Sequence, residues 1–273
     1  MRKLALEDMS AAVREVLGVD RLQLQPKPFP HLVLDGFFEP GLYEQLRTEF
    51  PQITKMKRPK GWGQSLYWGD AEYDAHLAAS PAWKKVHDMV HSQEWIEYII
   101  QQFGDYWRSE GCTVDLAKAV YVPYCEDRID KELLELRRPA HPPHELWSRL
   151  DFYQSYSGYY RPVHLDHRRR LISMLVYFQD KDEVGMEGGE LILHPPSFDL
   201  AMLERLRLYH APKPFSKLRD RLAQTIAVKP KHNRMAVFPC GKHSWHSVPA
   251  VRSEIAPRQH IQITISSSYD AWN

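Results

Sequence analysis

Two histidines and one aspartate, placed in separate parts of the chain, constrain its fold most strongly. His164 and Asp166 flank Leu165, and His246 follows far downstream. On an extended strand alternate side chains share a face, so His164 and Asp166 can point the same way while Leu165 points into the packing layer. If His246 joins them, two imidazoles and one carboxylate face a single metal ion. Such a set holds Fe(II) on one face and leaves positions open for a substrate and O2.

The residues that follow the H-x-D pattern favour short β-strands. A basic turn, His167 to Arg170, leads into an apolar run that is long enough for a buried strand. Trp245 to Val251 surrounds the second histidine. The predicted strands are Leu171 to Phe178, the end of the segment Gly188 to Leu193, Arg234 to Phe238, and an alternating strand from Arg258 to Ile265.

The order of these elements resembles that of the iron(II)/2-oxoglutarate-dependent dioxygenases, and within them the prolyl-4-hydroxylase-like group. The shared elements are H-x-D, an apolar strand ending in Tyr, G-G-E-L, N-R-x-x-x-F, W-H-x-V and a following Arg. They extend from about Tyr153 to Ser266, and a weaker similarity to the family occurs from Phe29 to Phe38. The resemblance implies a mainly β fold with supporting helices (α+β), a double-stranded β-helix or cupin-like jelly roll. Periodicity alone would predict a β-barrel or sandwich for this half.

The resemblance also implies the site residues and the cofactors. Fe(II) would be the metal, 2-oxoglutarate the cosubstrate and O2 the oxidant, with succinate and CO2 released. An arginine suits the distal carboxylate of 2-oxoglutarate because its planar guanidinium donates two parallel hydrogen bonds. The implied roles are metal binding for His164, Asp166 and His246, binding of that carboxylate for Arg258, and cosubstrate contacts for Tyr177 and Tyr156.

Two alternatives remain open for these roles. His243 lies shortly before His246, but His246 precedes the V-P-x-V segment that follows the second histidine in the family. Arg252 competes with Arg258, and strand alternation favours Arg258. That alternation places Arg258, His260, Gln262 and Thr264 on one polar face and Ile261, Ile263 and Ile265 on the other.

We expect residues 1–273 to form a single catalytic domain, since 273 residues suit one sizeable core. Residues 1–125 are expected to supply supporting helices and first strands, and residues 150–270 the β-helix core. Helical spacing of apolar residues occurs at Met9 to Leu17, Gly41 to Phe50 and Pro81 to Phe103.

Three segments lack a clear period. Gly61 to Asp70 is rich in glycine and aromatic residues and predicts an ordered loop that contacts substrate or simply packs. Glu126 to Trp147 is charged and Pro-rich, which indicates a mobile or linker-like loop. At residues 195–228 the apolar spacing predicts an insertion with one or two short helices. We expect either a lid that excludes water or an external decoration or dimer contact.

Composition excludes several classes of partner. The 36 basic and 35 acidic residues produce no global field that would attract nucleic acid or an anionic membrane. No apolar run approaches the roughly 20 residues of a membrane helix, and the start of the chain lacks a signal peptide. Cys112, Cys125 and Cys240 are too few for a disulfide framework, so a cytoplasmic protein is expected. The sequence leaves the oligomeric state open.

Three function classes follow from these observations. The leading hypothesis is a 2-oxoglutarate-dependent hydroxylase that oxidises an unactivated C–H bond of a small molecule, an amino acid or a biosynthetic metabolite. Asp166 favours hydroxylation, because halogenating relatives replace this carboxylate with a small residue. A peptidyl or protein hydroxylase is the alternative, although no appended recognition domain or repeat is evident. A non-catalytic cupin-like binding module is disfavoured by the presence of all three ligands and Arg258.

Overall fold

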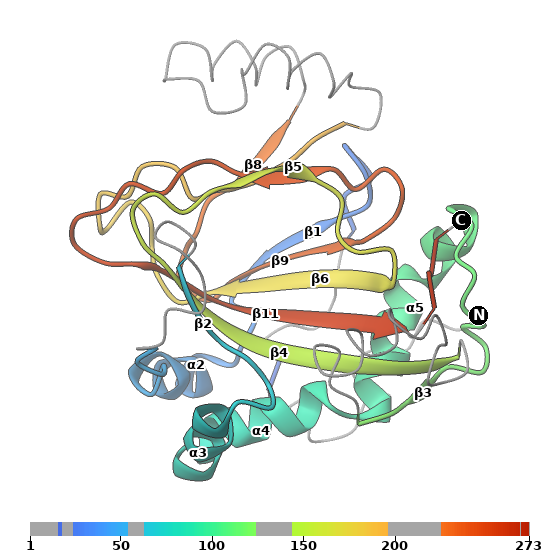
Figure 1. Ribbon diagram of the computed structural model, residues 1–273, viewed down its shortest axis with the longest axis horizontal. Coiled ribbons are helices and arrows are strands. Elements are labelled where there is room, and N and C mark those ends of the chain that lie inside the picture. The colour runs from blue at the N-terminus through green and yellow to red at the C-terminus, as the bar shows by residue number, and fades with distance from the viewer. Residues whose placement is uncertain are drawn as a thin grey trace.

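The computed structural model describes residues 16–17, 24–53, 63–123, 144–195, 225–267 and 269–272. Two sheets face each other (Figure 1), and the chain alternates between them from β4 to β7 and again from β8 to β11. The larger has the order β1-β9-β6-β11-β4-β2, with β3 beside β4, and the smaller has the order β5-β10-β7-β8. This alternation makes a double-stranded β-helix, which confirms the predicted fold class.

Among the described residues, every strand pair is antiparallel except β3 with β4. The larger sheet contains β1 (Leu32–Asp35), β2 (Gln64–Leu66), β3 (Val120–Tyr121), β4 (Glu145–Ser155), β6 (Arg170–Tyr177), β9 (Arg234–Pro239) and β11 (Arg258–Ser267). The smaller sheet contains β5 (Arg161–His164), β7 (Leu191–Leu193), β8 (Ile226–Val228) and β10 (His246–Val248).

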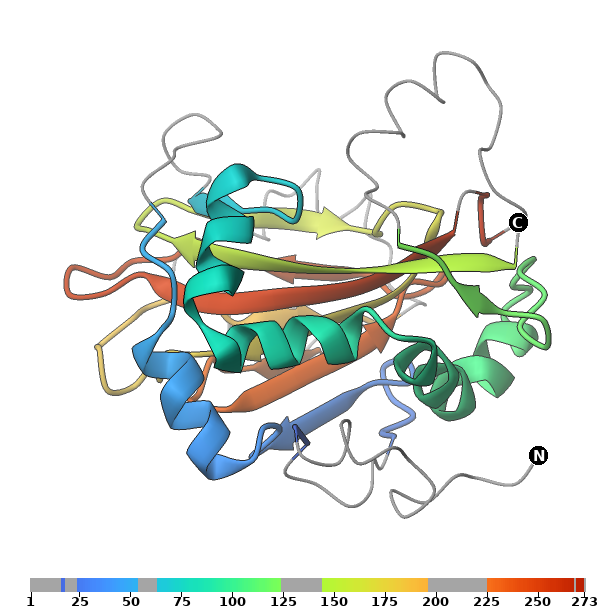
Figure 2. The ribbon, with the colours of Figure 1, turned by 90° about the horizontal axis from the view of Figure 1, so that it is seen from below.

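Helices cover the outer face of the larger sheet (Figure 2). They are α2 (Pro40–Thr48), α3 (Ala71–Ala79), α4 (Pro81–Val90) and α5 (Gln93–Ser109). The apolar side chains of β11, Ile261, Ile263 and Ile265, pack in one cluster with the buried helical residues Trp83 and Phe103. The other face of β11 is polar and faces the smaller sheet, as alternation predicts.

The helical stretch predicted from Pro81 to Phe103 is two helices rather than one. The Ser92 hydroxyl accepts a hydrogen bond from the backbone N–H of Trp95 at 3.2 Å and so begins α5. Such a serine cap satisfies an N–H that has no partner within its own helix, and it favours a new helix over continuation of the old one. The predicted helix from Gly41 to Phe50 corresponds to α2, whereas most of Met9 to Leu17 lies outside the described residues.

Two of the predicted loops are partly strands. Glu145 to Trp147 begin β4 instead of ending a linker, because Leu146 and Trp147 are buried and pair with β11. Within Gly61 to Asp70, the residues Gln64–Leu66 form β2 and pair with β4. The described part of the chain does not include residues 61–62, residues 124–143 or most of residues 195–228. The predicted lid therefore lies outside the described residues. No helix among the described residues is long and apolar enough to cross a membrane.

Candidate active site

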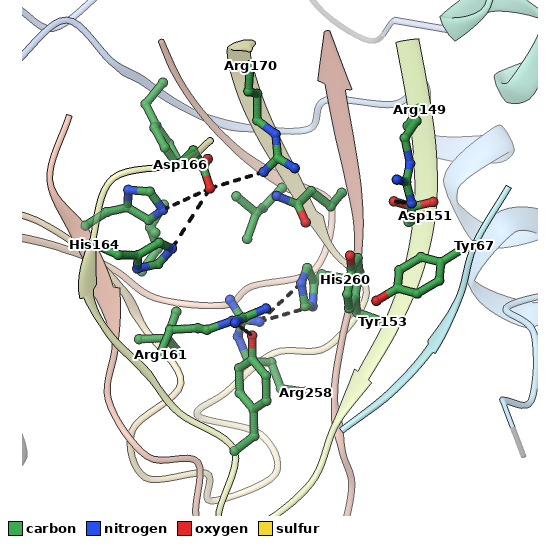
Figure 3. A pocket seen from close by; sticks show the side chains of 17 residues that line it. Tyr67, Arg149, Asp151, Tyr153, Arg161, His164, Asp166, Arg170, Arg258 and His260 are labelled. Carbon is green, nitrogen blue, oxygen red and sulfur yellow. Dashed lines mark hydrogen bonds and ion pairs between the residues drawn. The ribbon is translucent and has the colours of Figure 1, made fainter. Parts of the chain in front are cut away.

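A cavity of about 230 Å³ lies between the two sheets (Figure 3). Its walls come mainly from β4, β5, β6, β10 and β11, so strands distant in sequence meet around one space. Both ends of the predicted site, the metal ligands and Arg258, contribute to its lining. The lining residues are Tyr67, Arg149, Asp151, Tyr153, Tyr159, Arg161, His164, Asp166, Arg170, Leu175, Leu191, Phe238, His246, Val248, Arg258, His260 and Gln262.

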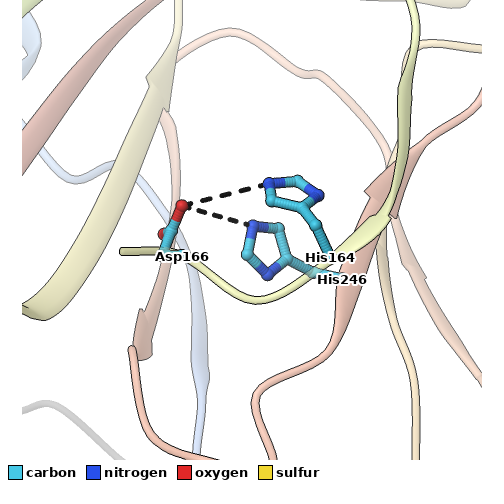
Figure 4. A group of neighbouring side chains, drawn as sticks. All are labelled: His164, Asp166 and His246. Carbon is cyan, nitrogen blue, oxygen red and sulfur yellow. Dashed lines mark ion pairs between the residues drawn. The ribbon is translucent and has the colours of Figure 1, made fainter. Parts of the chain in front are cut away.

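The structure brings the two predicted histidines and the aspartate together (Figure 4). His164 ends β5 and His246 begins β10, and the two residues are direct partners in the antiparallel pair. Asp166 follows in the turn after β5. The Nε2 atom of each histidine lies 3.9 Å from Asp166 Oδ1. One ligand atom from each residue lies within 4.8 Å of the others, which is compact enough to surround a metal ion.

Hydrogen bonds orient both imidazoles towards the aspartate. His164 Nδ1 lies 2.8 Å from the carbonyl oxygen of Pro162, and His246 Nδ1 lies 2.9 Å from that of Ser244. A carbonyl only accepts, so Nδ1 carries the proton in each ring and the Nε2 lone pair faces inward. Burial lowers the pKa of His246 to about 4, which keeps its ring neutral. Two imidazoles and one carboxylate fit a divalent cation.

Strand β6 fixes the carboxylate of Asp166. The Ser173 hydroxyl donates a hydrogen bond of 2.6 Å to Oδ2, and Arg170 Nη1 lies 3.1 Å from Oδ1. Cys240 Sγ also lies 3.3 Å from Oδ2. Burial would raise the pKa of Asp166, but the charge of Arg170 and the bond from Ser173 hold it well below its usual range. The carboxylate is therefore ionised, with Oδ1 facing the imidazoles.

Arg258 forms the opposite end of the cavity and is only 1% exposed. Its Nε donates to the carbonyl oxygen of Gly189 at 2.7 Å, and its Nη2 donates to the Tyr177 hydroxyl at 3.2 Å. Its Nη1 lies 3.1 Å from His260 Nδ1. A Cβ on Gly189 would lie 3.2 Å from the Arg258 side chain, which explains the second glycine of G-G-E-L. These bonds fix a planar cation that can bind a carboxylate through two donors.

The alternative residues do not line the cavity. His243 is half exposed and pairs with Glu110 at 2.8 Å. The side chain of Arg252 is 73% exposed and lies 3.9 Å from Glu187. Both lie away from the metal ligands, which agrees with the preference for His246 and Arg258.

The structure does not bring Tyr156 together with the other predicted site residues. Its side chain is 45% exposed and does not line the cavity, whereas Tyr177 is fully buried beside Arg258. The chain turns directly after β4, where the backbone N–H of Tyr159 bonds to the carbonyl oxygen of Tyr156. This turn directs Tyr156 outward and places Tyr159 on the cavity wall instead.

Several cavity residues were missed from the sequence, and three of them lie on β4. Arg149, Asp151 and Tyr153 alternate along β4 with the core residues Leu150 and Phe152. This alternation of polar and apolar residues is the sequence pattern that predicts a strand with one face towards the cavity. Arg149 Nη2 lies 2.8 Å from Asp151 Oδ2, and both side chains are nearly buried. Further cavity residues that were missed are Arg161, Arg170 and Leu191, whereas Tyr67 lies in the segment Gly61 to Asp70 that was predicted to contact substrate or simply pack.

Comparison with solved structures gives three matches of low identity. A prolyl 4-hydroxylase from Phytophthora capsici is 15% identical with a TM-score of 0.45, and the match covers 87% of this chain and 58% of that one. EctD from S. alaskensis, solved with 2-oxoglutarate and 5-hydroxyectoine, is 12% identical with a TM-score of 0.45, covering 87% and 72%. A Trichoplax adhaerens prolyl hydroxylase, in complex with a hypoxia inducible factor peptide fragment, is 11% identical with a TM-score of 0.42, covering 87% and 83%.

The family comparison is more direct. No curated protein sequence matches the chain. Residues 150–264 match the model of the 2OG-Fe(II) oxygenase superfamily, and this range contains all three residues of the metal-ligand cluster and Arg258. Fe(II), 2-oxoglutarate and O2 are the cofactor, cosubstrate and oxidant that go with this family. Over residues 150–264, the chain is therefore similar to the 2OG-Fe(II) oxygenase superfamily.

Proposed function

We propose that the chain hydroxylates an unactivated C–H bond of a small molecule, an amino acid or a biosynthetic metabolite. The reaction consumes 2-oxoglutarate and O2 and releases succinate, CO2 and the alcohol. The observation that carries this proposal is the convergence of His164, Asp166 and His246 at the wall of a cavity whose other end holds Arg258.

In this proposal His164, Asp166 and His246 hold Fe(II), which with 2-oxoglutarate supplies the oxidising chemistry. Each imidazole presents a lone pair because a backbone carbonyl holds its other nitrogen in the protonated form. Ser173 donates to Oδ2 of the aspartate, while Oδ1, which also lies 3.1 Å from Arg170 Nη1, faces the Nε2 atoms of both histidines. Fixed ligands of this kind need no reorganisation when the metal binds.

Arg258 would bind the distal carboxylate of 2-oxoglutarate. The Tyr177 hydroxyl accepts a hydrogen bond from Arg258, so its own proton is free to point at the same carboxylate. His260 orients the guanidinium without adding charge, since burial and the neighbouring Arg258 hold its pKa well below the usual value. One cation and one hydroxyl donor thus converge on one anion.

The size of the cavity supports a small substrate. At about 230 Å³ it is smaller than the roughly 300–1,000 Å³ of common small-molecule sites, and it must also admit 2-oxoglutarate.

The test measures succinate release from 2-oxoglutarate, with and without Fe(II), across a library of free metabolites and of peptides. The proposal expects Fe(II)-dependent release that a free small molecule stimulates. Stimulation by peptides alone would establish the peptidyl hydroxylase instead. A chain that binds neither Fe(II) nor 2-oxoglutarate would be a binding module.

A further inference from the structure

The cavity carries an excess of positive charge. Four guanidinium groups line it, from Arg149, Arg161, Arg170 and Arg258, against the carboxylates of Asp151 and Asp166 among the described lining residues. Four positive charges against two negative charges leave an excess of two positive charges. A cleft lined by an excess of one charge attracts ligands of the opposite sign.

Binding of Fe(II) and 2-oxoglutarate would not remove this excess of positive charge. This part of the inference rests on the proposed function. Fe(II) adds two positive charges and 2-oxoglutarate adds two negative charges, so their sum is zero. The two histidine ligands bind as neutral rings, and His260 is neutral as well. The loaded cavity therefore still favours an anion in addition to the cosubstrate.

The positions of the arginines indicate where this anion would lie. Arg149 pairs with Asp151 on β4, and Arg170 lies against the metal-facing Asp166. Arg258 is engaged by the proposed cosubstrate. Arg161 begins β5, the strand that ends in the metal ligand His164, and it lines the same cavity (Figure 3).

A hydroxyl group accompanies Arg161. Its Nε lies 3.3 Å from the hydroxyl oxygen of Tyr159, another residue of the cavity wall. Tyr159 is buried, while Arg161 is partly exposed, so the guanidinium can meet a ligand that enters from solvent. A guanidinium fork beside a phenol hydroxyl matches the oxygens of a carboxylate or a phosphate.

We propose that the substrate carries an anionic oxygen group, a carboxylate or a phosphate, and that Arg161 with Tyr159 binds it. Because Arg161 and His164 share a short strand, an anion held there places a neighbouring part of the substrate close to the metal ligands. Arg161 is then a specificity-determining residue of the cavity.

The experiment compares matched pairs of compounds on the full chain loaded with Fe(II) and 2-oxoglutarate under anaerobic conditions. One arm contains carboxylic acids with their primary amides, and the other contains phosphate esters with their parent alcohols. The rise in melting temperature reports binding, and succinate release in air reports turnover. The variants are Arg161→Gln and Arg161→Lys, with Arg252→Gln as the control, which removes the same charge from an exposed position.

We expect the anionic members of one arm, and not their neutral partners, to raise the melting temperature. Arg161→Gln should weaken this binding about 10- to 100-fold, which is the range for a lost charge-assisted hydrogen bond. Arg161→Lys should retain part of the binding, and Arg252→Gln should equal wild type. The KM for 2-oxoglutarate should not change in Arg161→Gln.

Three results would overturn the inference: neutral and anionic members bind equally, no anionic member binds, or Arg161→Gln behaves as Arg252→Gln does. A rise in the KM for 2-oxoglutarate in Arg161→Gln would assign Arg161 to the cosubstrate instead. Failure of the proposed function is separate, since wild type would then bind no Fe(II) or 2-oxoglutarate before any compound is added.

Discussion

Replacing Arg258 with glutamine should remove the anchor of 2-oxoglutarate while the chain still folds. The guanidinium is 1% exposed and donates to the carbonyl oxygen of Gly189 and the hydroxyl of Tyr177. Removing one partner of a buried, hydrogen-bonded charge pair costs about 2–5 kcal/mol. At about 1.4 kcal/mol for each factor of ten, the Kd for 2-oxoglutarate should rise roughly 30- to 4,000-fold.

The assay is a calorimetric titration of 2-oxoglutarate into anaerobic protein loaded with Fe(II). Arg252→Gln is the matched control, because its side chain is 73% exposed and surface substitutions usually change free energies by less than about 0.5 kcal/mol. Its Kd should therefore stay within about twofold of wild type. Melting curves of both variants without ligand separate weak binding from unfolding. If Arg252→Gln loses binding and Arg258→Gln keeps it, the cosubstrate site lies at the turn and the reasoning fails.

Three further predictions concern the metal, the backbone and pH. Ser173→Ala should lower Fe(II) affinity about 10- to 100-fold, because the metal-facing carboxylate loses a bond of 2.6 Å; unchanged affinity in a metal titration would contradict this. Gly188→Ala should lower the melting temperature far more than Gly185→Ala. Both have positive φ, but the added Cβ at Gly188 would lie 1.9 Å from a backbone oxygen and that at Gly185 meets open space, so equal effects would refute the argument. Burial lowers the pKa of His87 to about 4 and that of His91 to about 3. The unfolded chain therefore binds protons that the native protein does not. The free energy of unfolding should fall as pH drops from about 6.5 to 4, by up to about 1.4 kcal/mol per pH unit for each histidine. Urea-induced unfolding at pH values of about 6.5 and 4 should show this decrease in the free energy of unfolding. If His87→Gln leaves the pH dependence of that free energy unchanged, the prediction is wrong.

Much of the β-helix core could be predicted from the sequence because its strands are short, apolar and separated by clear turns. The alternation in β11 correctly divided Arg258 and His260 from the isoleucines of the core. Strand β4 carries an equally clear alternation of Arg149 and Asp151 with apolar residues. The start of β4 follows a charged, Pro-rich segment that is typical of loops, so the sequence predicts a loop where the strand begins.

Other features depend on contacts that sequence periodicity does not encode. Whether Tyr156 or Tyr159 faces the cavity is decided by the turn after β4, since both lie in one aromatic run. The break between α4 and α5 depends on Ser92 acting as a cap, and apolar spacing continues across it. The excess of arginines in the cavity arises because β4, β5, β6 and β11 meet around one space.

The most direct test of the account is an anaerobic titration of Fe(II) into the full chain, followed by succinate release from 2-oxoglutarate in air. Wild type and His243→Ala should each bind one Fe(II) per chain and release succinate, since His243 pairs with Glu110 away from the cavity. Asp166→Ala should lose both, because two imidazoles alone hold the ion poorly. Full Fe(II) binding and turnover in Asp166→Ala, or their loss in His243→Ala, would contradict the assignment of the metal site.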